Sequence, residues 1–172
     1  FRKPDSILQG HPDMKHIPGV DMSSGSLGQG ISAACGMALS GKIRHKDYRV
    51  YAILGDGECE EGEVWEAAMF AAHYKLSNLC VFVDVNGLQI DGATKDVMNP
   101  QPFDEKFRSF GWNVAVIDGH NFDEIADALK AARQSDKPFA VIANTVKGKG
   151  VSYMENNVAW HGSAPNDEQY AV

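Results

Sequence analysis

The sequence is poor in three features that each mark a class of proteins: paired cysteines, long apolar runs and excess positive charge. The cysteines, Cys35, Cys59 and Cys80, are an odd number without CxxC spacing. This argues against a disulfide framework and for packed thiols in a reducing compartment. No apolar run approaches the roughly 20 residues of a membrane-spanning helix, and the first residues do not follow the basic, apolar and small order of a signal peptide. We therefore expect a cytoplasmic protein.

The charge balance argues against two kinds of partner. The net charge is −7, whereas nucleic acids and anionic membrane surfaces are bound through basic surface. A phosphorylated ligand is still compatible with this charge, because local backbone N–H groups and a metal ion can outweigh it. With 172 residues, 44% of them hydrophobic and 23% charged, the chain can bury the core of one soluble domain.

Short apolar segments alternate with helical patterns along the chain. Segments typical of buried strands lie at residues 49–54, 78–85, 112–118 and 139–145. Patterns typical of helices lie at residues 28–44, 61–76, 103–110 and 123–134. The alternation predicts an α/β fold with a doubly wound, mainly parallel sheet flanked by helices. It does not determine the order of the strands. We expect irregular structure before residue 28 and from residue 147 to Asp167.

Two polar residues follow predicted strands and carry the first chemical signal. Asp56, between Gly55 and Gly57, comes after the first strand, and Asn86 comes after the second. A right-handed crossover places the ends of two parallel strands next to each other, so these side chains can converge. A carboxylate and an amide oxygen suit Mg²⁺, which completes its octahedron with phosphate oxygens and water. Glycines beside Asp56 allow the backbone to approach a diphosphate.

Two other ligand classes fit the sequence less well. The glycine run at residues 25–30 has no clear strand before it and lacks GxGxxG spacing, which argues against a dinucleotide loop. The acidic run at residues 56–63 lacks the residue order of a calcium loop and overlaps the start of a predicted helix.

The spacing of these motifs is similar to that of a known family. Gly55-Asp56-Gly57 with Asn86 resembles the GDG…N signature of thiamine diphosphate (ThDP) enzymes. The segments that narrow this resemblance are GHPDMKHIPGVDMSSGSLGQG, EGEVWEAA, NGLQIDG, TVKGKG and WHGSAPND. Together they resemble transketolase, especially its separately encoded N-terminal subunit. The resemblance implies that residues 1–172 form a single diphosphate-side domain, with an upstream segment and a pyrimidine-binding partner domain outside it.

The resemblance implies a role for several residues on the cofactor side. Asp56, Asn86 and the backbone carbonyl of Leu88 would bind Mg²⁺, or Ca²⁺ in its place. The cofactor itself would be contacted by the residues of three motifs, namely Gly25, Leu27, Gly57, Lys147 and His161.

The resemblance also implies four catalytic residues. His11 and His161 would act near the reacting carbons of the substrate. Glu61 and Glu66 would belong to a carboxylate network that links paired active sites. The remaining histidines have no motif around them and are predicted to be surface or packing residues: His16, His45, His73 and His120.

The implied activity is ThDP- and Mg²⁺-dependent transfer of a two-carbon ketol unit from a ketose phosphate to an aldose phosphate, in the pentose phosphate pathway. It would require a complementary pyrimidine-binding (C-terminal) subunit, within a homo- or hetero-oligomer. One alternative is another ThDP enzyme on the same scaffold, such as a deoxyxylulose-phosphate synthase or a sulfosugar or apulose ketolase. Another is a non-catalytic or truncated ThDP-binding partner.

Overall fold

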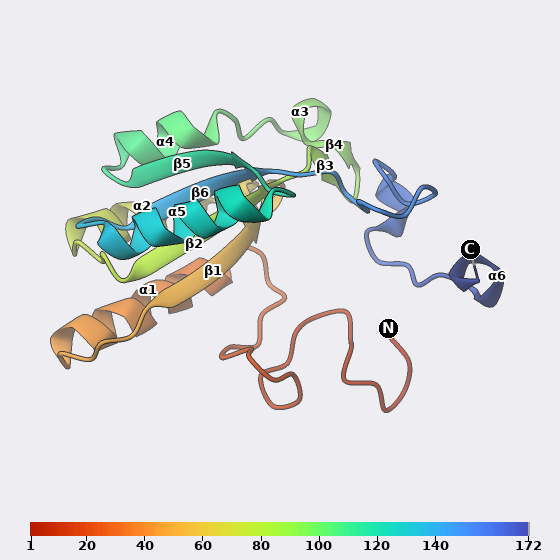
Figure 1. Ribbon diagram of the computed structural model, residues 1–172, viewed down its shortest axis with the longest axis horizontal. Coiled ribbons are helices and arrows are strands. Elements are labelled where there is room, and N and C mark those ends of the chain that lie inside the picture. Colours follow the sequence, from red (N-terminus) through yellow and green to blue (C-terminus); the bar gives the residue numbers. More distant parts are fainter. Residues whose placement is uncertain (172) are drawn as a thin grey trace.

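A parallel four-stranded sheet forms the centre of the computed structural model, which describes residues 1–171 (Figure 1). Its strands are β1 (Val50–Gly55), β2 (Leu79–Val85), β5 (Asn113–Asp118) and β6 (Phe139–Asn144). They lie in the order β1-β2-β6-β5, and all three pairings are parallel. The predicted fold class is confirmed, and each predicted strand is present within a residue or two of its expected bounds.

Helices cover both faces of this sheet (Figure 1). They are α1 (Gln29–Ile43), α2 (Gly62–His73), α4 (Phe103–Ser109) and α5 (Phe122–Gln134). The first three share one hydrophobic cluster with the sheet, while α5 packs on the opposite face through Ala128 and Ala132. None of the helices in residues 1–171 is long and apolar enough to cross a membrane.

The pleat of the central strands explains how both faces are filled. In β2, Val81 and Val83 face the cluster of α1, α2 and α4, while Cys80 faces α5. Successive side chains of a strand point to opposite faces, so a strand buried on both sides must be apolar throughout. The three cysteines are buried free thiols, as predicted. Burial raises the pKa of Cys35 and of Cys80 to about 11.

Several short elements were not predicted. They are β3 (Leu88–Gln89), β4 (Gly92–Ala93), α3 (Thr94–Val97), α6 (Asp167–Tyr170) and the 3₁₀ turns η1 (Glu58–Glu60) and η2 (Val158–Trp160). Segments this short carry too few residues to show a period. Local hydrogen bonds hold them instead: Thr94 N donates to the Gly87 carbonyl over 3.0 Å, and Asn166 and Gln169 form a capping box at α6.

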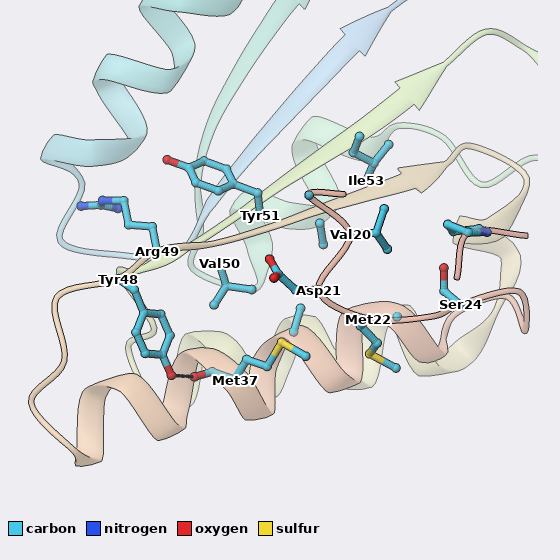
Figure 2. A pocket seen from close by; sticks show the side chains of 15 residues that line it. Val20, Asp21, Met22, Ser24, Met37, Tyr48, Arg49, Val50, Tyr51 and Ile53 are labelled. Carbon is cyan, nitrogen blue, oxygen red and sulfur yellow. Dashed lines mark hydrogen bonds between the residues drawn. The ribbon is translucent and has the colours of Figure 1, made fainter. Parts of the chain in front are cut away.

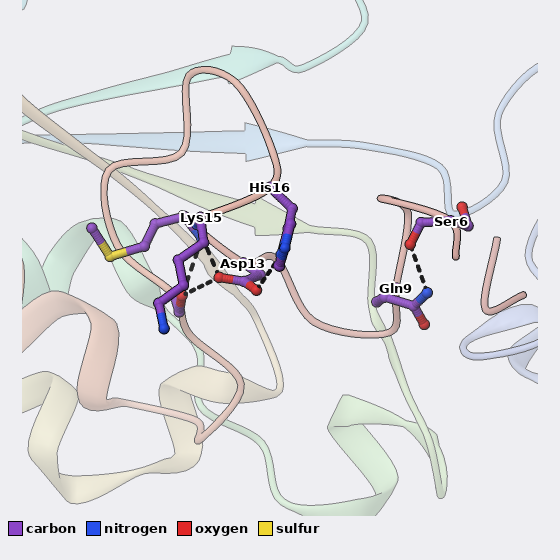
Figure 3. Close-up of polar contacts among 7 residues, drawn as sticks. Ser6, Gln9, Asp13, Lys15 and His16 are labelled. Carbon is purple, nitrogen blue, oxygen red and sulfur yellow. Dashed lines mark hydrogen bonds and ion pairs between the residues drawn. The ribbon is translucent and has the colours of Figure 1, made fainter. Parts of the chain in front are cut away.

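The segment before α1 is irregular, as predicted, and is ordered by its own polar contacts (Figure 3). Asp13 accepts hydrogen bonds from Lys15 N over 3.0 Å and from Ser23 Oγ over 3.2 Å, and it pairs with His16 Nδ1 at 2.7 Å. Both terminal segments lie beyond the carboxyl ends of the strands (Figure 1). They are joined there by Arg2, whose Nη1 donates to the Gly162 carbonyl over 2.7 Å.

Candidate cofactor site

Two places on the chain offer room for a ligand. The first is a groove of about 730 Å³ between the N-terminal segment, α1 and β1 (Figure 2). Its lining is mostly apolar and includes Met22, Met37 and Ile53. The side chain of Ile53 is 78% exposed there, because β1 is the edge strand and α5 does not cover it. The second place is the carboxyl-end edge of the sheet, which gathers the polar residues.

The ends of three strands meet at this edge. Asp56 N donates to the Asp84 carbonyl over 3.1 Å, and Thr145 N donates to the Val85 carbonyl over 3.0 Å. The residues that follow β1, β2 and β6 therefore lie side by side. This is the usual position of ligands in open parallel α/β sheets.

Asp56 is the buried anchor of the site, with 2% of its surface exposed. Its Oδ1 accepts a hydrogen bond from Gly57 N over 2.9 Å, and its Oδ2 accepts one from Gly87 N over 2.6 Å. The second bond brings the aspartate to the loop that starts at Asn86, so the expected convergence of the two motifs is present. Burial raises the pKa of Asp56, and the charge of Asp84 adds to this rise, whereas the two N–H donors oppose it.

The donors around Asp56 fit a cation. A buried carboxylate is normally paired with a positive charge or bound to a metal. The ion pairs within residues 1–171 join His16 to Asp13, Arg108 to Asp104 and Lys130 to Asp127, and none of them includes Asp56. The described residues contain no cluster of three His, Cys, Asp or Glu side chains. A metal here would therefore draw on amide, backbone and ligand oxygens as well.

Asn86 is held in one orientation by its neighbours. Its Nδ2 donates to Asp84 Oδ2 over 3.1 Å, and its Oδ1 accepts from Leu88 N over 3.0 Å. The other oxygen of Asp84 accepts a hydrogen bond from Thr145 Oγ1. Asp84 thus ties the ends of β2 and β6 together and keeps the amide oxygen of Asn86 turned away from it. Asp84 and Thr145 were missed at the sequence level, although Asp84 shares a strand face with Asn86 by its two-residue spacing.

Leu88 and Gly57 lie around the same loop. Leu88 opens the small hairpin of β3 and β4, where it pairs with Ala93. A Cβ added at Gly57 would lie 3.0 Å from Gln89 Cβ, so the hairpin packs directly on this glycine. The Gly57 N–H already donates to Asp56, and binding a diphosphate would require that donor to be shared or exchanged.

The loop before α1 lies against the acidic segment after Asp56. Gly28 is the N-cap of α1, has φ +81° and is packed so that an added Cβ would lie 2.9 Å from Glu61 Cβ. Leu27 is 58% exposed. A Cβ at Gly25 would lie 2.8 Å from His11 Cγ, which places the imidazole directly on that glycine. Gly25 and His11, predicted to serve cofactor and substrate, are therefore in contact.

Lys147 and His161 are also brought together, by the turns that follow β6. Lys147 Nζ lies 3.2 Å from His161 Nδ1. Because an ammonium group has only donors, Nδ1 must accept, and the imidazole carries its proton on Nε2. Partial burial lowers the pKa of His161, and the charges of Lys147 and Arg2 lower it further. The ring is thus held neutral with one N–H donor free.

Removing the Lys147 charge is expected to raise the pKa of His161. In Lys147→Met the aliphatic stem stays, while the positive charge that disfavours the imidazolium is lost. Lys149→Met, on the same turn and exposed, is the matched control. The measurement is an NMR pH titration of the His161 ring protons in parent and variants. An unchanged His161 titration in Lys147→Met would contradict the contact.

Three further residues named from the sequence complete the picture. Glu61 is the exposed N-cap of α2, and Glu66 is exposed on that helix. Within residues 1–171 neither side chain makes a hydrogen bond that would show the predicted carboxylate network. His120, predicted to be a surface or packing residue, is exposed, but its Nε2 accepts a hydrogen bond from Val146 N over 2.8 Å. It therefore supports the turn that carries Lys147.

Comparison with known proteins gives consistent matches. The family model described as transketolase, thiamine diphosphate binding domain, matches residues 1–172. A 6-deoxy-6-sulfo-D-fructose transketolase subunit from Clostridium sp. (strain MSTE9) is 46% identical over 99% of this chain and 62% of its own length. One of the two subunits of an apulose-4-phosphate transketolase, from Phocaeicola vulgatus, is 43% identical over 96% of this chain and 59% of its own length.

A solved structure agrees with the sequence matches. The crystal structure of transketolase from Campylobacter jejuni superposes with a TM-score of 0.90 at 33% identity, over 98% of this chain and 28% of that one. The chain thus spans about three fifths of the two bacterial relatives and a smaller part of the longer enzyme.

Proposed function

Since the chain belongs to the transketolase family, as its thiamine diphosphate-binding domain, we propose that it anchors the diphosphate of ThDP through a divalent cation in a ketol-transferring enzyme. The cation would be Mg²⁺, or Ca²⁺ in its place, bound by Asp56, Asn86 and the Leu88 carbonyl. The observation that carries this proposal is the buried Asp56 carboxylate, hydrogen bonded to the Asn86–Gly87 loop and without a cationic side chain. Hard oxygen donors of this kind suit such cations.

The residues of the chain would divide the work of the site. Bound ThDP supplies the electron sink needed for carbanion chemistry. Asp56 and Asn86 would hold the diphosphate end, while the loop with Gly25 and Leu27 would contact the rest of the cofactor. Neutral His161 would donate its Nε2–H to a substrate oxygen, and His11 would move a proton at the sugar hydroxyls or carbonyl.

The proposed reaction is transfer of a two-carbon ketol unit from a ketose phosphate to an aldose phosphate. The names of the two bacterial relatives add a sulfosugar and apulose 4-phosphate as candidate substrates. Both relatives are named as subunits, which supports a complementary pyrimidine-binding chain as partner. In that assembly Glu61 and Glu66 would face the second active site. The cytoplasm and the pentose phosphate pathway remain the predicted setting.

A turnover assay with and without the complementary chain tests the proposal. The chain alone is expected to bind ThDP weakly and to show no ketol transfer, because half of the cofactor would lie in water. Adding the complementary chain should restore both binding and transfer. Donors to be compared are xylulose 5-phosphate, 6-deoxy-6-sulfofructose and apulose 4-phosphate. Ketol transfer by the 172-residue chain alone, at rates normal for enzymes, would show that no partner is needed. Cofactor binding without transfer in the assembly would indicate a non-catalytic subunit.

A further inference from the structure

One carboxylate connects two of the loops that surround the candidate site. Glu58 is the first residue of η1. Its Oε1 accepts a hydrogen bond from Gly28 N over 2.9 Å, and its Oε2 accepts one from Gly55 N over 3.2 Å. Gly28 ends the loop that contains Gly25 and Leu27, whereas Gly55 opens the motif of Asp56. The two oxygens of one side chain therefore bind segments that are distant in the sequence.

Both ends of this bridge are constrained by the backbone. Gly28 is buried, adopts a left-handed φ of +81° and caps α1 without any side-chain hydrogen bond of its own. Its N–H would be unsatisfied without Glu58, and a buried donor left unpaired is costly. Gly55 ends β1, in register with Asp84 of β2. A shift of Glu58 would thus move the α1 loop relative to the sheet edge that carries the metal-binding residues.

We propose that Glu58 is a positioning residue that sets the separation between the Gly25–Gly28 loop and the Gly55–Gly57 motif for cofactor binding. This inference rests on the proposed function of the site. Two N–H donors that converge on one side chain require two acceptors, and only a carboxylate at the end of a two-methylene stem supplies both here. A glutamine offers one acceptor and turns an NH₂ group toward the other N–H. An aspartate keeps the charge but is too short to reach both loops.

Three variants separate the bridge from charge and from stability. Glu58→Gln removes one acceptor and the charge, and Glu58→Asp keeps the charge without the reach. Glu105→Gln, on the exposed surface of α4, is the control for loss of one negative charge. Each is prepared in the full protein assembled with its complementary chain. ThDP affinity is measured by calorimetry at fixed Mg²⁺, loop protection by hydrogen exchange of peptides that contain Gly28, and stability by urea unfolding.

Glu58→Gln and Glu58→Asp are each expected to weaken ThDP binding at least about tenfold, since a hydrogen bond to a charged group is worth about 1.5–3 kcal/mol and about 1.4 kcal/mol is tenfold in affinity. Exchange at Gly28 should become faster in both, while Glu105→Gln behaves like the parent. Parental affinity in Glu58→Gln, full affinity in Glu58→Asp, or a fall in stability without loss of affinity would each overturn the proposal. Failure of the parent to bind ThDP would instead overturn the proposed function.

Discussion

Replacing Asp56 by alanine is expected to abolish Mg²⁺-dependent binding of ThDP in the assembled enzyme. Asp56 is the only buried carboxylate at the site among the described residues, and its removal deletes the charged ligand of the cation. Loss of an outer-sphere partner alone weakens metal binding about 10–100-fold, so loss of this ligand should exceed about a hundredfold. Asn86→Ala should act in the same direction, because it leaves an octahedral site one oxygen short. Calorimetric titration of ThDP at several Mg²⁺ concentrations measures both effects.

The control for Asp56→Ala must separate binding from folding. The substitution leaves the N–H groups of Gly57 and Gly87 without their acceptor, so Asp56→Asn, which keeps the shape, is tested in parallel. Asp127→Ala removes an exposed carboxylate from α5 and should bind ThDP like the parent. Circular dichroism verifies the fold of each variant. Parental ThDP affinity in a folded Asp56 or Asn86 variant would reject these residues as metal ligands.

Replacing His11 or His161 by alanine is expected to reduce turnover far more than cofactor affinity. The two side chains lie on the loops around the cofactor and not at Asp56: His11 rests on Gly25, and His161 contacts Lys147. Loss of a general acid or base typically costs about 10²–10⁴-fold in rate. Steady-state kinetics of ketol transfer, combined with calorimetry of ThDP binding, measure the two quantities separately.

A matched histidine provides the control for these variants. His45 is exposed beyond the end of α1 with φ +52°, a conformation that asparagine tolerates. His45→Asn should retain parental turnover. Should His11→Ala and His161→Ala also bind and turn over substrate like the parent, both histidines would be structural. A loss of ThDP affinity as large as the loss of rate would place them at the cofactor instead.

Some of the site could be predicted because it depends on where strands end. Asp56 and Asn86 each follow an apolar run directly, and parallel strands joined by a crossover must end at the same edge. Their convergence therefore needs no knowledge of side-chain packing. The same holds for Lys147, which follows β6 after a short turn. His11 and His161 belong to irregular segments without a period, and only the family resemblance pointed to them.

The sequence by itself determined the strands, the main helices and the α/β class, because apolar period and turn residues are local properties of the chain. Only the tertiary structure placed β6 between β2 and β5, since strand order depends on which crossovers pack best. It also decided the contacts that tie the loops together: Glu58 to Gly28, Asp84 to Thr145, and Arg2 to Gly162. Each joins residues far apart in the chain, and such bonds exist only when folding has brought their backbones within reach.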